Sequence, residues 1–258
     1  MNAIELYKRL PRKNCGQCRP KACMPFALSV LKGDAAISEC PLLTEQEREE
    51  LGAGITQSDW REELIAKLRE EIQRISYTDI AEGLGAVLDK GSLVIRCMGR
   101  DFRISPEGEI ESQAAMTPWM KILLLHYVRT AGKGDFTGKW VSFSELKAGM
   151  VKASAFQAEC EEPLKELFDR DSGKAAAILQ RLGGLKQEGF PTREAYLLSL
   201  LPKIRVVILY WPEEEDFPSR VKILFDALSD SFLDVETIIF LAEGFVHNLE
   251  AQMSLDKG

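Results

Sequence analysis

The sequence lacks any apolar run of the roughly 18–20 residues that a helix needs to span a bilayer. The two longest apolar stretches, 122–128 and 206–211, have the length of core elements, and the first contains His126. The opening residues MNAIELYKRL include three charged side chains and no hydrophobic signal core. We therefore expect no membrane span and a cytoplasmic protein.

The common catalytic motifs are also missing. The sequence contains no P-loop, no GxGxxG fingerprint, no GxSxG nucleophile elbow and no HExxH pair. Histidine is scarce, because His126 and His247 are the only two, and each lies in a segment of helical periodicity. Either could ligate a metal or a corrinoid cobalt, but an isolated helical histidine is more often a core or surface residue. We predict no catalytic residue, and whether the chain is an enzyme stays open.

What the sequence does have is a concentration of cysteine near its start. Four of the six cysteines follow the pattern C-x2-C-x4-C-x16-C, namely Cys15, Cys18, Cys23 and Cys40, and Pro41 comes directly after the last. In a cytosolic chain, such cysteines indicate metal ligation before disulfides. Four thiolates hold iron–sulfur clusters, and several bacterial ferredoxins also place proline after the final cysteine. The pattern favours an iron–sulfur cluster on these four residues.

Other uses of cysteine fit the pattern less well. Structural zinc sites usually pair two C-x2-4-C knuckles, whereas here only Cys15 and Cys18 form one. Haem attachment needs histidine after the second cysteine, and that position is Arg19. Zinc and purely structural thiols remain the alternatives. Cys97 and Cys160 fall on apolar faces of a predicted strand and helix, so we predict buried structural thiols there.

Charge is distributed unevenly along the chain. The net charge is −7, yet residues 1–33 carry +6, which leaves −13 for the rest. Cations near an anionic cluster stabilise it and tend to raise its potential, although a solvated basic surface is an equal alternative. Nucleic-acid binding is less favoured, because no recognisable module accompanies the basic residues. The acidic stretch 213–216 could bind a cation or dock the basic region, but a solvated turn is favoured.

The order of predicted elements indicates an α+β fold in three parts. A cluster-binding module, 1–43, precedes a helical connection, 44–76, whose first helix opens with a capping box of Thr44 and Glu47. A larger domain of mixed antiparallel sheet and helix follows over 77–258. Periodicity predicts helices over 3–10, 23–32, 117–132, 155–168, 172–182 and 234–251, and strands over 92–98, 101–104, 140–143, 206–211 and 221–225.

The stretch NCGQCRPKACMPFALSVLKGDAAISECPLL resembles a known family, the small 4Fe–4S domain of corrinoid iron–sulfur protein large subunits. It is also similar to the corresponding domain of Rnf-type electron-transport complexes. Arg19 departs from a commonly found glycine, and Pro25 stands within the helix start. The remainder resembles an uncharacterised domain of unknown function that follows such modules in iron–sulfur proteins of anaerobes. The residues shared with the family are Cys15, Gly16, Cys18, Cys23, Phe26, Ala27, Gly33, Cys40 and Pro41.

The resemblance implies one 4Fe–4S cluster, with Cys15, Cys18, Cys23 and Cys40 as its ligands. It also implies a one-electron carrier in anaerobic metabolism whose partner is a redox protein, with a corrinoid protein as one candidate. The alternative is a binding or assembly protein in which the cluster is structural. No activity is implied for the larger domain.

Overall fold

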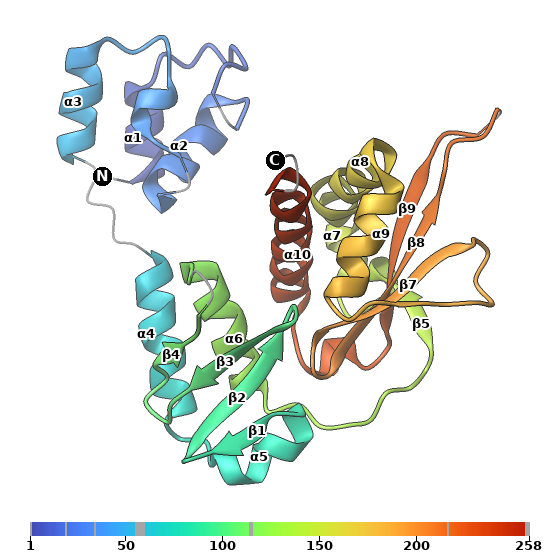
Figure 1. The fold of residues 1–258 in the computed structure, drawn as a ribbon. Helices are drawn as coiled ribbons and strands as arrows, with labels where there is room; N and C mark the ends of the chain where they lie inside the picture. Colours follow the sequence, from blue (N-terminus) through green and yellow to red (C-terminus); the bar gives the residue numbers. More distant parts are fainter. Residues whose placement is uncertain are drawn as a thin grey trace. The chain divides into compact units, whose positions relative to one another are not determined.

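The computed structural model describes residues 2–18, 20–33, 35–54, 60–113, 116–215 and 217–255. The chain divides into two compact units, Met1–Ala66 and Lys67–Gly258, called here the N-terminal and C-terminal units (Figure 1). Helix α4, Trp60–Ile72, runs across the division. Both β-sheets are antiparallel and lie in the C-terminal unit, which confirms the predicted α+β class.

The N-terminal unit is built from short helices whose ends are defined by the sequence. Asn2 and Glu5 form a capping box at the start of α1, and the Thr44 N–H donates to Glu47 Oε2 at 2.8 Å before α3, as the sequence predicts. Gly33, in the left-handed region with φ 75°, ends α2. The helices are α1 Ala3–Arg9, α2 Cys23–Lys32 and α3 Glu45–Gly54, with a 3-10 turn at Ile37–Glu39.

A single small core holds these helices together. Phe26 and Val30 of α2 pack with Leu6 of α1, and Leu51 of α3 joins the same cluster. Units of this size bury little apolar surface, so additional cross-links contribute strongly to their stability. The buried members of the cluster are Leu6, Leu10, Phe26, Ala27, Val30, Ala35, Cys40, Leu43 and Leu51.

The first sheet of the C-terminal unit is a four-stranded meander flanked by two helices. Leu93, Ile95 and Cys97 alternate along β2 and are all buried, as their spacing predicts. The hydroxyl of Tyr77 donates to the Ser105 carbonyl at 2.9 Å. The elements are α5 Tyr77–Leu84, β1 Val87–Asp89, β2 Ser92–Cys97, β3 Arg100–Ile104, β4 Ile110–Glu111 and α6 Pro118–Thr130.

The second sheet has five strands in the spatial order β5-β9-β8-β7-β6. The predicted strands 206–211 and 221–225 form its centre as β8 and β9. Sequence periodicity did not predict β7, which pairs with β8 from Glu194↔Tyr210 to Leu201↔Ile204. The strands are β5 Trp140–Ser142, β6 Leu185–Lys186, β7 Glu194–Leu201, β8 Ile204–Trp211 and β9 Arg220–Asp226.

Helices cover one face of the five-stranded sheet (Figure 1). The Phe168 ring lies 4.8 Å from that of Tyr210, and the Phe156 ring 5.7 Å from that of Phe225, measured between centroids. Among the described residues, no helix combines the length and apolar character needed to cross a membrane. The helices are α7 Gly149–Phe156, α8 Glu162–Arg170, α9 Ser172–Arg181 and α10 Val235–Leu255.

One predicted helix differs in the structure. The single helix expected over 155–168 is α7 and α8 joined by a π-helical segment, Gln157–Glu161, and it begins earlier, at Gly149. A π segment adds a residue to the turn and shifts the apolar face. Cys160 lies in this segment and is fully buried, as predicted.

Direct hydrogen bonds join the two sheets into one unit. The Met98 N–H donates to the Leu200 carbonyl at 2.9 Å. Tyr127 of α6 donates its hydroxyl hydrogen to the Leu84 carbonyl at 2.7 Å and accepts the Lys203 N–H at 3.1 Å. Tyr127 is buried, so each of these bonds replaces a lost contact with water.

Candidate metal centre

The four cysteines predicted as ligands come from three neighbouring pieces of the N-terminal unit. Cys15 and Cys18 lie in the loop between α1 and α2, Cys23 is the first residue of α2, and Cys40 follows the 3-10 turn. Cys40 is buried and Cys18 and Cys23 are half-buried, and all three pack with the small core. Cys15 is exposed. The cysteine group therefore has an inner side against the core and an outer edge at the surface.

The thiol of Cys18 is influenced by the thiols of the other three cysteines. Burial, a hydrogen-bond contact with the Cys40 thiol, and the nearby thiols of Cys15 and Cys23 raise the pKa of Cys18 to about 11. As a free thiol, Cys18 is therefore protonated at neutral pH. A coordinating metal displaces that proton, because thiolates are the ligands. The Cys18 thiol is thus influenced by the other three thiols, while the role of the four residues as ligands stays a prediction.

Asn14 fixes the start of the cysteine loop against α2. Its side-chain Oδ1 accepts the Cys23 N–H at 2.8 Å, so it satisfies an N–H that the preceding Ala22 side chain leaves without a cap. Asn14 has φ 45° and Gly16 φ 73°, both left-handed, which asparagine and glycine tolerate better than other residues. Sequence reasoning missed Asn14, although its position directly before Cys15 was a usable signal.

Arg48 fixes the other end of the site. Its Nη2 donates to the Cys40 carbonyl at 2.8 Å across the start of α3. Its Nε is buried and has no hydrogen-bond partner among the described residues. A buried donor is normally satisfied, so the unpaired Nε–H leaves an incompletely bonded cation beside the Cys40 backbone. Sequence reasoning missed Arg48 as well.

The donor set fits an iron–sulfur cluster. Within the part of the chain that the structure describes, no three His, Cys, Asp or Glu side chains lie close enough to hold a single metal ion. A 4Fe–4S cubane binds each thiolate through a different iron, so its four ligands surround the cluster and do not meet at one point. Four thiols, three of them packed on an apolar core, and the Arg48 cation at the Cys40 carbonyl suit the donors and the charge of an iron–sulfur cluster.

Comparison with known sequences matches most of the chain to two families. The family described as "Domain of unknown function (DUF3786)" matches residues 76–248. The chain belongs to the DUF3786 family. A second family, described as "Putative Fe-S cluster", matches residues 10–42, the stretch that contains all four cysteines. The predicted resemblance is confirmed. The match supports an iron–sulfur cofactor in the segment that precedes the DUF3786 domain in the sequence.

Curated relatives match over short stretches only. The corrinoid/iron-sulfur protein large subunit of Moorella thermoacetica is 40% identical over 53 residues, which is 20% of this chain and 12% of that protein. The acetyl-CoA decarbonylase/synthase complex subunit gamma of Methanocaldococcus jannaschii is 42% identical over 43 residues, covering 17% and 9% of the two chains. The matched stretch therefore spans about a tenth of each relative's length. No solved structure matches the chain significantly.

The histidines of the DUF3786 domain stand apart as single residues. His126 is half-buried on α6, and burial, reinforced by Arg129, lowers its pKa. His247 is exposed on α10, with its Nδ1 2.9 Å from the Glu243 carbonyl oxygen. Neither belongs to a metal-binding group among the described residues. Cobalt or metal ligation by either histidine gains no support from these positions.

The described part of the acidic stretch, 213–215, lies between β8 and β9. Glu213, Glu214 and Glu215 are exposed, and Glu214 forms an isolated bridge with Phe217. Asp216 lies outside the described residues. The position matches the solvated turn between strands that the sequence favours.

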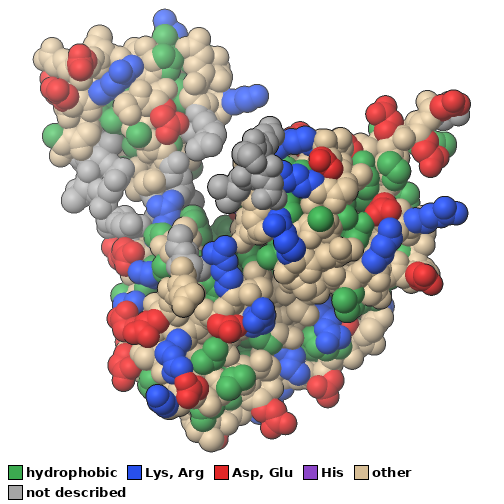
Figure 2. Space-filling model, in the orientation of Figure 1, with side chains coloured by type: hydrophobic (Ala, Val, Ile, Leu, Met, Phe, Trp, Pro, Cys, Tyr) green, Lys and Arg blue, Asp and Glu red, His purple; other side chains and the backbone are tan. Residues whose placement is uncertain are grey.

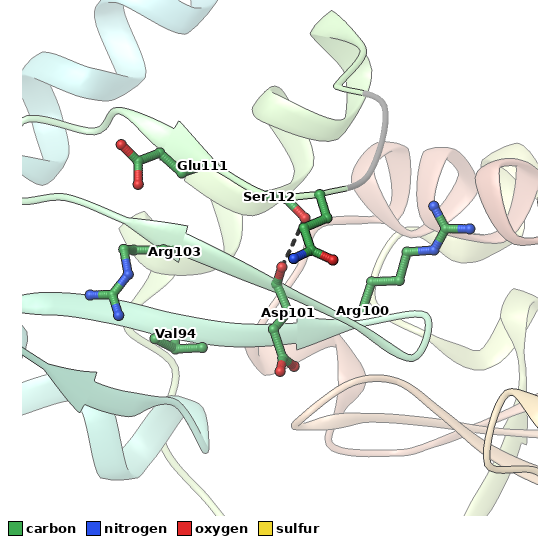
Figure 3. Close-up of a pocket in the computed structure, with 7 residues that line it drawn as sticks. Val94, Arg100, Asp101, Arg103, Glu111 and Ser112 are labelled. Atoms are coloured by element: carbon green, nitrogen blue, oxygen red, sulfur yellow. Dashed lines mark hydrogen bonds between the residues drawn. The ribbon is translucent and has the colours of Figure 1, made fainter.

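The DUF3786 domain also has an open groove of about 870 Å³ on the solvent face of β2 and β3 (Figure 3). Ser112 donates its hydroxyl hydrogen to the Asp101 carbonyl at 2.8 Å, which Figure 3 marks with a dashed line. Arg103 pairs with Asp89, and Arg96 with Asp101 at 3.4 Å. Opposite charges alternate across this surface, so the groove does not select a ligand of one sign.

Glu161 is the most buried acid on the helical side of the second sheet. It is 5% exposed, and its Oε2 lies 2.6 Å from Lys222 Nζ while Oε1 accepts the Ile223 N–H at 3.1 Å. Glu161 thus supplies a hydrogen-bond acceptor for the backbone of β9 at Ile223, just beyond the residues of β9 that pair with β5. Both carboxylate oxygens have partners. Glu161 therefore has a structural role at the edge of the sheet, and neither oxygen is available for catalysis.

Proposed function

We propose that the chain binds one 4Fe–4S cluster through Cys15, Cys18, Cys23 and Cys40 and carries single electrons to or from a protein partner. The observation that carries the proposal is the arrangement of the four cysteines in one small unit, with Cys15 exposed and Cys18, Cys23 and Cys40 packed on its core. When bound, the cluster gains or loses one electron without making or breaking bonds to substrate. Cys18, Cys23 and Cys40 would hold the cluster from the side of the apolar core, and Cys15 would hold it from the surface.

The partner we propose is a redox protein of anaerobic cytoplasmic metabolism. Two relatives are named as a corrinoid/iron-sulfur protein and as a subunit of an acetyl-CoA decarbonylase/synthase complex. These names support a corrinoid protein as one candidate. A reducing compartment also suits a chain whose six cysteines are all free thiols.

A structural role for the cluster is the second candidate. Cys18, Cys23 and Cys40 pack directly on the core of the N-terminal unit, so a cluster on them would also cross-link that core. The DUF3786 domain would then do the binding, and the cluster would keep one oxidation state.

Chemical analysis and spectroscopy of anaerobically purified protein test the proposal. We expect about four irons and four acid-labile sulfides per chain, and an EPR signal after dithionite reduction. Cys15→Ala, Cys18→Ala, Cys23→Ala and Cys40→Ala should each lose that signal, while Cys97→Ala, which changes a buried thiol in the other unit, should keep it. Colourless protein that contains zinc would reject the cluster. Iron and sulfide without any reducible signal would reject electron transfer and leave the structural role.

A further inference from the structure

We propose that the surface around Cys15 is a docking site for an acidic redox protein. The inference rests on the proposed function, because it concerns where the cluster exchanges electrons. It adds the chemical character of the partner and the residues that recognise it.

Three exposed cations lie within a few residues of the cysteines in the loop between α1 and α2. Lys13 is two residues from Cys15, and Lys21 is two residues from Cys23, which limits each Cα–Cα distance to about 7.6 Å. Arg12 precedes Lys13 in the same loop, and all three side chains are exposed. Figure 2 shows both Lys or Arg and Asp or Glu side chains on the visible face of the N-terminal unit. A partner that reaches the Cys15 edge therefore meets positive charge first.

These cations are not neutralised by neighbouring acids. The sequence has no acidic residue from position 6 to position 33. None of Arg12, Lys13 and Lys21 forms an ion pair within the described part of the chain. Three acids of the N-terminal unit have partners elsewhere: Glu5 accepts the Asn2 N–H and Glu39 the Ala36 N–H, each at 2.9 Å, and Glu50 lies 3.9 Å from Arg9.

The charge of the rest of the chain favours an acidic protein over a nucleic acid. Residues beyond position 33 carry −13, which would repel a long polyanion that extends past the loop. A protein needs only one acidic face to match the three cations. Such complementarity raises the association rate and orients the encounter, and here it would orient the partner over the one exposed thiol.

Two small reducing radicals of opposite charge can show whether the positive loop or the negative net charge of the chain governs the rate of cluster reduction. The sulfur dioxide radical anion formed by dithionite and the methyl viologen radical cation each give the oxidised cluster one electron, and become sulfur dioxide and methyl viologen dication. If the loop controls access, the rate with the anion should fall roughly threefold between about 0.02 M and 0.5 M ionic strength, and the rate with the cation should rise. If the net charge of −7 controls access, the trends reverse, and the proposal is wrong.

Charge-reversal variants assign the effect to the loop. Lys13→Glu with Lys21→Glu should remove or invert the salt dependence with the anion, and Lys13→Gln with Lys21→Gln should give an intermediate result. Lys133→Glu is the matched control, because Lys133 is an exposed lysine of the C-terminal unit. Iron and sulfide contents measured first show whether each variant holds its cluster.

Binding gives a readout that does not depend on cluster reduction. Calorimetry with an acidic bacterial ferredoxin should show salt-sensitive binding to the full chain, at least tenfold weaker in the Lys13→Glu, Lys21→Glu variant and unchanged in Lys133→Glu. Equal binding by all three proteins would overturn the docking site even if the cluster is redox-active. Tighter binding of a single-stranded oligonucleotide than of the ferredoxin would assign the surface to nucleic acid instead. A redox-silent cluster with ferredoxin binding intact would reject only the electron-transfer function.

Discussion

Arg48 couples the backbone of a cysteine to a fixed positive charge. Its guanidinium donates to the Cys40 carbonyl, and Cys40 itself is 3% exposed. Charge in such a setting is screened less than at an open surface. An anionic cluster on the four thiols would be stabilised by this cation, more in its reduced form than in its oxidised form, because reduction adds negative charge.

We therefore expect Arg48→Met to lower the midpoint potential of the cluster by tens of millivolts, on the order of a 1 kcal/mol electrostatic change. Arg48→Lys keeps the charge and should retain most of the potential while losing the planar donor geometry. Arg74→Met is the control, because Arg74 is an exposed arginine paired with Glu70 in the other unit. Potentiometric titration followed by EPR measures all three. An unchanged potential with reduced thermal stability would show that Arg48 acts only on the fold.

The iron–sulfur resemblance of the cysteine stretch could be predicted from sequence, and Asn14 beside Cys15 offered a signal, whereas the Arg48 contact offered none. Thiolate chemistry restricts the ligands to a few residue types, and their spacing is visible in one line of sequence. Arg48 acts through a contact eight residues from Cys40 that depends on how α3 returns to the core. Asn14 acts through an amide oxygen that reaches Cys23 nine positions ahead. Both contacts are tertiary, and no periodicity records them.

At the scale of elements, a buried carboxylate joins the end of β9 to the loop before β5. Asp226 is 1% exposed. Its carboxylate accepts hydrogen bonds from the N–H groups of Thr137, Gly138 and Leu228 and from the Thr137 hydroxyl, at 2.9–3.1 Å. Burial acts to raise the pKa of Asp226, but these four hydrogen bonds outweigh it and hold the pKa below its usual value.

Asp226→Asn should destabilise the C-terminal unit by about 2–4 kcal/mol at pH 7, because an amide nitrogen faces N–H donors that now lack an acceptor. The native carboxylate has a lowered pKa, so its stabilisation is present above the unfolded pKa of about 3.9 and is lost as pH falls through the folded pKa. The difference between the two proteins should therefore shrink below about pH 4. Urea unfolding at several pH values measures this, with the exposed Asp101→Asn as control. A pH-independent difference would contradict the assignment.

Elements with clear periodicity were predicted, as was the continuous apolar strand β8, but β7 and the start of α7 were not. β2 alternates buried and open residues and was recognised. β7 was missed because apolar residues occupy both of its faces, which removes the alternation that identifies a strand. The π segment before α8 shifts the helical register and hid the start of α7. In both cases, tertiary burial determines the structure more than the local pattern does.

At the scale of the whole molecule, each unit has its own core and its own family match. Among the described residues, the core cluster of the N-terminal unit has nine buried members, all within Met1–Ala66. The iron–sulfur match, 10–42, falls in that unit, and the DUF3786 match, 76–248, falls in the other. The proposed cluster should therefore stabilise the first unit, and its loss should leave the second with its own interactions intact.

Removal of iron tests this separation. Chelation under anaerobic conditions should lower the unfolding temperature of the N-terminal unit or abolish its transition, because a core this small depends on its cross-link. The C-terminal unit, with two sheets and six helices among its described residues, should keep its unfolding temperature within about 2 °C. Calorimetry gives the two transitions, and hydrogen exchange read by mass spectrometry assigns each to its residues. Cys97→Ala protein treated in the same way is the control for thiol chemistry outside the site. If exchange rises throughout residues 76–248 when iron leaves, the two units fold as one, and the cluster stabilises the DUF3786 domain as well.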